Sequence, residues 1–156
     1  MPRSGVFFTV LTIGLFGCSR HDGIERALIT GLITVQGAPL DFASVQFIPI
    51  GAGNGAMPGA LGVSDASGKF EVISSRRDDP GIPPGEYLVI VSRWANPDGK
   101  PLGPDETQAD NLAAAETVPA PYSGSNSPLR ATISKEGGEV KLDIPVKLLN
   151  KKKPKT

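Results

Sequence analysis

The stretch PPGEYLVIVSR, residues 83–93, contains five consecutive apolar residues, 87–91, which decide the fold class. A short run that is apolar on both faces is typical of a strand in the middle of a sheet. Two prolines and Gly85 interrupt the chain just before it, so we predict a turn followed by a central strand. Gly85 would provide unusual backbone angles in the turn. Tyr87 would pack its ring at the strand start, with its hydroxyl bonded to nearby backbone.

Apolar and polar residues alternate in several segments around this strand. The alternation covers 29–35 (ITGLITV), 43–49 (ASVQFIP), 129–134 (LRATIS) and 139–146 (EVKLDIPV). A period of two is typical of strands that bury one face. In the last segment we expect four side chains to point inward, those of Val140, Leu142, Ile144 and Val146.

A further strand signal surrounds the turn at 65–68, where ALGVSD leads into GKFEVIS. In such a turn Asp65 can bond to its own backbone, and Gly68 tolerates a positive φ. We therefore predict that the two segments form a hairpin. Asp65 and Gly68, like Gly85 and Tyr87, are interpreted as scaffold rather than as a binding site.

About seven strands, Gly- and Pro-rich turns and the lack of a long amphipathic helix predict an all-β fold. We expect an antiparallel β-sandwich with a prealbumin-like or immunoglobulin-like Greek key. The roughly 140 residues after Cys18 are enough for one domain with one core, which we place at 28–148. Residues 149–156 are interpreted as a basic, flexible tail. Because Cys18 is the only cysteine, no internal disulfide can support the core.

The segment 94–128 is too long for an ordinary connection between two strands. Its middle, 105–117, could form a short helix with Asp105 as the N-cap. Trp94 and Tyr122 bracket the segment. Exposed aromatic rings on a loop would suit a sugar- or peptide-binding surface. The alternative is that both rings only fix the loop to the sandwich.

The N-terminus has the features of a bacterial lipoprotein signal. Arg3 precedes an apolar run, 6–16, that is about as long as the h-region of a signal peptide and too short to span a membrane. The tetrapeptide LFGC, which ends at Cys18, resembles a lipobox. The resemblance implies a signal peptide at 1–17 and lipidation of Cys18, with 18–27 as lipidated N-terminus and tether. The alternative is an unmodified thiol in a conventional signal peptide.

Sixteen Lys and Arg residues balance sixteen Asp and Glu residues, but the charges are unevenly distributed. Five lysines lie within 147–155, and ten basic residues face sixteen acidic ones between 19 and 146. A nucleic-acid partner is not expected, because the folded part would repel phosphates. The lysine-rich end could contact anionic lipid headgroups or acidic envelope polymers, or it could be a solvated terminus.

Several of these segments together resemble carboxypeptidase-regulatory-like, transthyretin-like domains. Five pieces stand in the order of that family, namely ITGLI (29–33), GAPL (37–40), ASVQFIP (43–49), SDASGKF (64–70) and PPGEY (83–87). PYS (121–123) and SPL (127–129) resemble the variant carried by many small planctomycete lipoproteins. The resemblance covers nearly all of the chain after Cys18. It implies a prealbumin-like sandwich with an accessory or binding role and no established activity.

The residue inventory argues against catalysis and against a metal or cofactor site. The single histidine, His21, lies on the expected tether, where no fold can position it against a base or a nucleophile. No Cys/His spacing is typical of a metal site, and the acidic pairs at 78–79 and 105–106 converge poorly. Hydroxyisourate hydrolases and intradiol dioxygenases have related sandwiches, but their chemistry uses histidines that this chain lacks.

We therefore expect a non-enzymatic lipoprotein, exported and anchored in the cell envelope by lipidated Cys18, on the periplasmic or outer-membrane face. Its β-sandwich would be a structural or interaction module for envelope proteins or cell-surface polysaccharide, without a cofactor. The alternative function is carbohydrate or small-ligand binding by the 94–128 loop, with contacts from Trp94 and Tyr122.

Overall fold

The computed structural model describes residues 23–51, 58–74 and 80–149, and every structural statement concerns these residues. They form eleven strands and no helix, so no helix in this part of the chain could cross a bilayer. The strands are β1 (Ile29–Val35), β2 (Ala38–Pro39), β3 (Ser44–Pro49), β4 (Ala60–Val63), β5 (Lys69–Glu71), β6 (Ile73–Ser74), β7 (Gly85–Ser92), β8 (Trp94–Ala95), β9 (Ala115–Glu116), β10 (Arg130–Ile133) and β11 (Gly138–Ile144).

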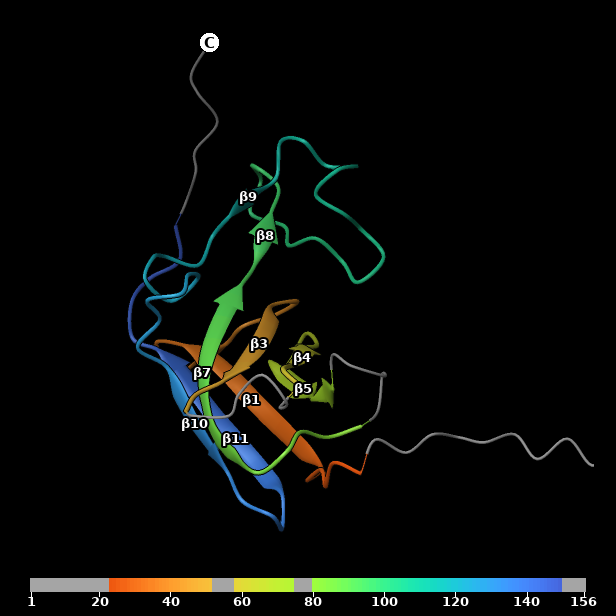
Figure 1. Cartoon of the computed structure of the whole chain (residues 1–156). Helices are drawn as coiled ribbons and strands as arrows, with labels where there is room; N and C mark the ends of the chain where they lie inside the picture. Colours follow the sequence, from red (N-terminus) through yellow and green to blue (C-terminus); the bar gives the residue numbers. More distant parts are fainter. Residues whose placement is uncertain (1–22, 52–57, 75–79, 150–156) are drawn as a thin grey trace, which may run out of the picture.

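Two sheets pack against each other and enclose one hydrophobic core (Figure 1). The first has the order β11-β1-β2, with β5 also paired to β1, and the second has the order β10-β7-β3-β4-β6. The buried cluster contains residues of both sheets, such as Ile33 and Ile144 from the first and Tyr87 from the second. The Phe47 ring lies 6.2 Å, centroid to centroid, from the rings of Phe70 and Tyr87. The expected all-β sandwich is confirmed.

The central strand is also confirmed, because β7 lies between β10 and β3. Tyr87, Val89 and Val91 are fully buried, and the residues between them are half-buried. The Tyr87 hydroxyl donates a hydrogen bond to the backbone oxygen of Pro83 at 2.7 Å. This bond allows the ring to be buried with its polar atom satisfied. Gly85, at the start of the strand, has a φ of 151°, which L side chains rarely adopt.

Buried and exposed residues alternate in β1 and β3 as the sequence predicts. In β11, Leu142 and Ile144 are buried and Val140 is half-buried. Val146 is 38% exposed, so the prediction of an inward side chain is wrong at this position. The strand ends before Pro145, which has no N–H to continue the ladder.

The turn at 65–68 forms, and the two segments around it pair in part as the hairpin predicts, since β4 runs antiparallel to β6 with Leu61 opposite Ile73 and Ala60 opposite Ser74. Oδ1 of Asp65 accepts hydrogen bonds from the backbone N–H groups of Ser67 at 2.7 Å and Lys69 at 3.0 Å. Gly68 has a φ of 79°, and a Cβ there would lie 2.5 Å from a backbone oxygen of β1. The departure from a simple hairpin is β5, which follows the turn directly: β4 pairs with β3 and β6, whereas β5 pairs with β1. Each strand thus finds its hydrogen-bond partners in a different sheet.

The helix expected around Asp105 is absent from the described residues. The segment forms separate turns, closed by single backbone bonds such as Asp110 N to Thr107 O at 3.2 Å. Leu112, the largest apolar residue between 105 and 117, is 90% exposed. A short helix is stable in a protein mainly because its apolar face packs against other elements. The apolar side chains of this segment have no such contact at Leu112, so packing does not stabilise a helix here.

β1 and β11 pair in parallel, from Ile29 opposite Gly138 to Val35 opposite Ile144. The other strand ladders among the described residues are antiparallel, so the sandwich is mixed rather than wholly antiparallel. Because the terminal strands are parallel, the chain joins the sandwich at one end and leaves it at the other. The segment 94–128 lies at the end where the chain leaves (Figure 1).

Candidate functional site

The segment 94–128 is held over the end of the sandwich where β7 finishes (Figure 1). Its first residues, β8, pair with β9, so that Trp94 lies opposite Glu116. The N–H of Leu102 donates to the backbone oxygen of Trp94 at 2.9 Å. Thr117 then donates its N–H to the backbone oxygen of Arg93 at 2.9 Å. These bonds join the outgoing and returning parts of the segment.

A buried arginine anchors this segment to the sandwich. Arg93 directly follows β7 and is only 7% exposed. Its Nε and Nη2 donate to Oδ1 of Asp41 at 3.0 and 2.8 Å. Its Nη1 donates to Oγ1 of Thr117 at 3.3 Å. The guanidinium thus links Asp41, which precedes β3, to Thr117, which follows β9 in the long segment.

Glu116 completes the same cluster from the other side. Its Oε1 accepts hydrogen bonds from the backbone N–H groups of Arg93 at 2.9 Å and Val118 at 2.8 Å. Its Oε2 accepts the hydroxyl of Ser92. Hydrogen bonds to a carboxylate are among the stronger ones in proteins, so this cluster fixes the segment close to β7.

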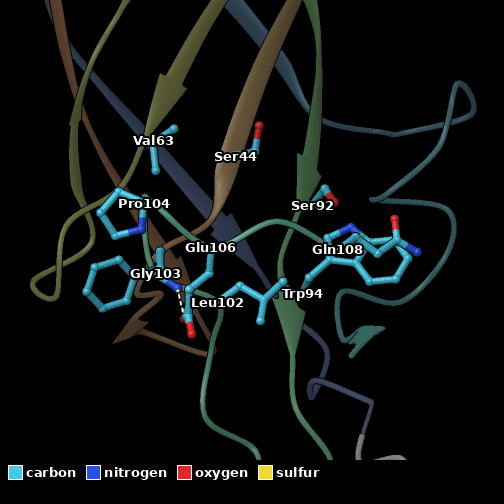
Figure 2. A pocket seen from close by; sticks show the side chains of 10 residues that line it. Ser44, Val63, Ser92, Trp94, Leu102, Gly103, Pro104, Glu106 and Gln108 are labelled. Carbon is cyan, nitrogen blue, oxygen red and sulfur yellow. Dashed lines mark hydrogen bonds between the residues drawn. The ribbon is translucent and has the colours of Figure 1, made fainter. Parts of the chain in front are cut away.

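A pocket of about 210 Å³ lies between the long segment and the outer face of the second sheet (Figure 2). Its floor is a row of side chains from three adjacent strands, Val63 of β4, Ser44 of β3 and Ser92 of β7. Ser44 is the register partner of both Val63 and Ser92. Opposed residues project from the same face of a sheet, so the three side chains form a continuous floor.

Trp94 and the segment 102–108 form the other walls of the pocket (Figure 2). The Trp94 side chain is half-buried. Glu106 is the only charged residue among those that line the pocket. Its Oε2 accepts the backbone N–H of Gly103 at 2.7 Å, which closes a tight turn and positions the carboxylate. The pocket therefore combines an indole ring, one carboxylate and mainly apolar walls.

Phe42 lines the same pocket and has a φ of 48°. A bulky residue in this left-handed region is strained, at a cost of about 1–3 kcal/mol. Its neighbours hold the conformation, since Phe42 N–H donates to Ser64 O at 3.1 Å and Ala43 N–H donates to Ser64 Oγ at 2.9 Å. Backbone strain of this kind is concentrated at functional sites, and here it lies beside the pocket.

The two aromatic residues singled out in the sequence do not come together. Trp94 lines the pocket, but Tyr122 does not. Tyr122 is partly buried and packs against the hydrophobic core, and its backbone oxygen accepts the N–H of Val91 at 3.0 Å. Tyr122 therefore fixes the returning segment to the sandwich, whereas Trp94 is available to a ligand.

Other residues of the sequence prediction lie outside the pocket or outside the described part of the chain. Asp65, Gly68, Gly85 and Tyr87 occupy the turns and the strand start described above. Cys18 and His21 lie outside the described residues, as does the lysine-rich end after residue 149. Within the described ranges, no group of three or more His, Cys, Asp and Glu side chains could hold a metal ion.

Asp41, Arg93 and Glu116 were not predicted from the sequence, and no role in binding was predicted for Glu106. Asp41 and Arg93 are 52 positions apart, and no local pattern connects them. The only available signal was an arginine directly after an apolar strand, which pattern analysis treats as an ordinary strand end.

Comparisons of the chain with protein-family models, with curated proteins and with solved structures found no match.

Proposed function

We propose that this chain is a non-enzymatic, lipid-anchored envelope lipoprotein of the carboxypeptidase-regulatory-like type, whose β-sandwich is an interaction module. The apolar run at 6–16 and the LFGC tetrapeptide ending at Cys18 support export and lipidation. Two or three acyl chains on Cys18 would give stable anchoring where one would be marginal. The sandwich would then lie on the periplasmic or outer-membrane face, in reach of envelope proteins.

The observation that carries the proposal is the opposite placement of the tether and the pocket. The chain enters the sandwich beside Ile29, the first residue of β1, whereas the Trp94 pocket lies at the opposite end, where β7 finishes at Ser92. The seven residues of β1 span about 20 Å. A domain anchored at its N-terminus would thus present its long segment at the end farthest from the point of attachment.

Cell fractionation tests the anchor. The wild-type chain is expected in the membrane fraction and should incorporate a fatty-acid label. The Cys18→Ser variant should do neither, because it lacks the thiol that is acylated. Recovery of the unlabelled variant in the membrane fraction would contradict lipid anchoring through Cys18.

Cross-linking in intact cells, followed by affinity capture and mass spectrometry, tests the interaction function. Specific envelope proteins captured with the anchored form, but not with Cys18→Ser, would support an interaction module. If the two forms captured the same proteins, or if only polysaccharide were recovered, the interaction function would be wrong.

A second candidate function is the binding of carbohydrate or another small ligand, and the Trp94 pocket favours it. Trp94 is the only tryptophan of the chain, so its fluorescence reports on this pocket alone. Saturable quenching by a neutral oligosaccharide is the expected result for this candidate. An emission that no oligosaccharide alters would exclude it for the sugars tested.

A further inference from the structure

We propose that the Trp94 pocket binds the cationic end of an arginine or lysine side chain from a partner protein. The inference rests on the interaction function proposed above and names the chemistry that the partner presents. Three properties of the pocket carry it: its charge, its aromatic and apolar lining, and its size.

The charge of the pocket is negative. Glu106 is the only charged lining residue, and no Lys or Arg in the described part of the chain forms an ion pair with it. Its Oε2 accepts one hydrogen bond, from Gly103, which leaves most of its acceptor capacity for a ligand. The whole segment 94–128 carries five acidic residues and one lysine. An incoming cation would therefore be attracted to this end of the molecule.

The lining suits a cation with an apolar stem. The indole of Trp94 can hold a guanidinium or ammonium group over its face. Val63, Leu102 and Pro104 line the same pocket and would contact methylene groups. Arginine and lysine side chains combine these two parts, a charged end and a stem of three or four CH₂ groups.

The size of the pocket favours one side chain over an oligosaccharide. Its volume of about 210 Å³ lies below the range of about 300–1,000 Å³ that is typical of small-molecule sites. Of its four polar side chains, Ser44, Ser92, Glu106 and Gln108, the hydroxyl of Ser92 already donates to Glu116.

An apolar patch beside the pocket extends the surface that a partner can contact. Leu61 and Ile73 are opposed across β4 and β6, and they are 44% and 46% exposed. Val63, which is 50% exposed, continues this patch along β4 into the pocket floor. We therefore expect the basic residue of the partner to stand beside apolar residues in an extended segment.

The lysine-rich end of the chain itself is the other source of the same chemistry. The N–H of Leu149 donates to the backbone oxygen of Thr117 at 2.7 Å, and Thr117 follows the register partner of Trp94. Four lysines lie beyond this point, within 151–155. An intramolecular occupant would compete at an effective concentration of roughly millimolar order, so the test must distinguish it from a partner protein.

Titration of Trp94 fluorescence in the purified, acylated protein tests the proposal. A polyoxyethylene detergent keeps the protein soluble without adding sugar headgroups. The probes are blocked peptides Gly-Leu-Arg-Leu-Gly and the same peptide with neutral citrulline, together with chitin and chitosan tetramers. We expect the arginine peptide to bind with a Kd of roughly millimolar order, about five- to tenfold tighter than the citrulline peptide.

Two variants with matched chemistry separate the site from general electrostatics. Glu106→Gln retains an oxygen that can accept from Gly103 and removes only the charge, so affinity for the arginine peptide should fall about threefold to fivefold. Asp105→Asn removes the adjacent charge, which does not line the pocket, and should leave the affinity unchanged. Isothermal calorimetry on both variants provides a second measurement that does not depend on fluorescence.

Each outcome decides between the alternatives. Equal affinity for the arginine and citrulline peptides, or no effect of Glu106→Gln, would overturn the proposal. Tighter binding of the chitin tetramer would show that the pocket binds sugars, and the cation assignment would be wrong. If replacing the four tail lysines by glutamine shifted Trp94 emission without any peptide, the occupant would be the chain itself. Partner capture that persisted in Glu106→Gln cells would leave the interaction function standing while this inference failed.

Discussion

Arg93 and Asp41 lie 52 positions apart in the sequence and form the ion pair that joins the long segment to the sandwich. Two guanidinium nitrogens share one carboxylate oxygen, at 3.0 and 2.8 Å. The arginine side chain is 8% exposed and the aspartate side chain 35%. The pair is therefore shielded from water mainly on the arginine side. Removing Asp41 would leave a buried charge, whereas removing Arg93 would leave a carboxylate that water can reach.

Asp41→Ala should lower the free energy of unfolding by about 2–3 kcal/mol, because it leaves a buried guanidinium without its counter-charge. Urea denaturation measures this change, and hydrogen exchange should show faster exchange in 94–118. Glu139→Ala is the matched control, since its ion pair with Lys141 is exposed and should contribute less than about 1 kcal/mol. Equal losses in the two variants would contradict a structural role for the Arg93–Asp41 pair.

Gly31→Ala should destabilise the sandwich, because the Phe70 ring lies directly against the backbone of Gly31. A Cβ at this position would lie 2.1 Å from Cζ of Phe70. Moving the buried ring aside should cost about 1–3 kcal/mol, measurable as a lower urea midpoint. The double variant Gly31→Ala/Phe70→Leu should lose less free energy of unfolding than the sum of the losses in the two single variants. Strict additivity would mean that the ring does not cause the effect.

Tyr87→Phe should lower the free energy of unfolding by about 1 kcal/mol at neutral pH, because it removes the hydrogen bond to Pro83. The variant should also change the response to alkali. Burial raises the pKa of Tyr87 to about 12, from an unfolded value of about 10. The folded state therefore retains its proton longer, and stability should fall as the pH rises from about 10 towards 12.

Denaturant midpoints measured across this alkaline range test that linkage. The wild-type midpoint should decline more steeply than that of Tyr87→Phe, so the difference between them should shrink or reverse. A parallel decline of both proteins would show that the titration of Tyr87 is not responsible.

Asp65→Asn should weaken the turn at neutral pH but have less effect in acid. Hydrogen bonds from the Ser67 hydroxyl and from the backbone N–H groups of Ser67 and Lys69 lower the pKa of Asp65. A depressed folded-state pKa contributes stability above the unfolded value, and this contribution is lost as the pH falls through the folded value. The difference in urea midpoint between the variant and the wild type should therefore be smaller at pH 3 than at pH 7. Asp105→Asn serves as the control and should match wild type at both.

The strands were predictable from the sequence because burial repeats with a local period. Ala43, Val45 and Phe47 are all fully buried, and the apolar run of β7 occupies the middle of its sheet. Pairing was less predictable, because it depends on segments far apart in the chain. β1 pairs in parallel with β11, which begins more than a hundred residues later, and β5 leaves its sequence neighbour β4 for the other sheet.

The candidate site, too, could be predicted from the sequence only in part. Trp94 could be identified because a lone tryptophan on a long connection is conspicuous in the sequence. Its partners could not, since the pocket is assembled from the ends of three strands and a turn around Glu106. Tyr122 carried the same sequence signal as Trp94, yet it packs on the core. Residue type alone does not distinguish a ring that lines a pocket from a ring that packs on the core.

The parallel pairing of β1 and β11 also has a mechanical consequence. A load applied between the start of β1 and the point where the chain leaves β11 would pull the two strands in opposite directions along their length. All seven register pairs, from Ile29–Gly138 to Val35–Ile144, would then bear the shear force together rather than separating one after another. Resistance to such a force depends on the unfolding rate rather than on equilibrium stability. A domain held at both ends could therefore stay folded under force for longer than its denaturation midpoint indicates.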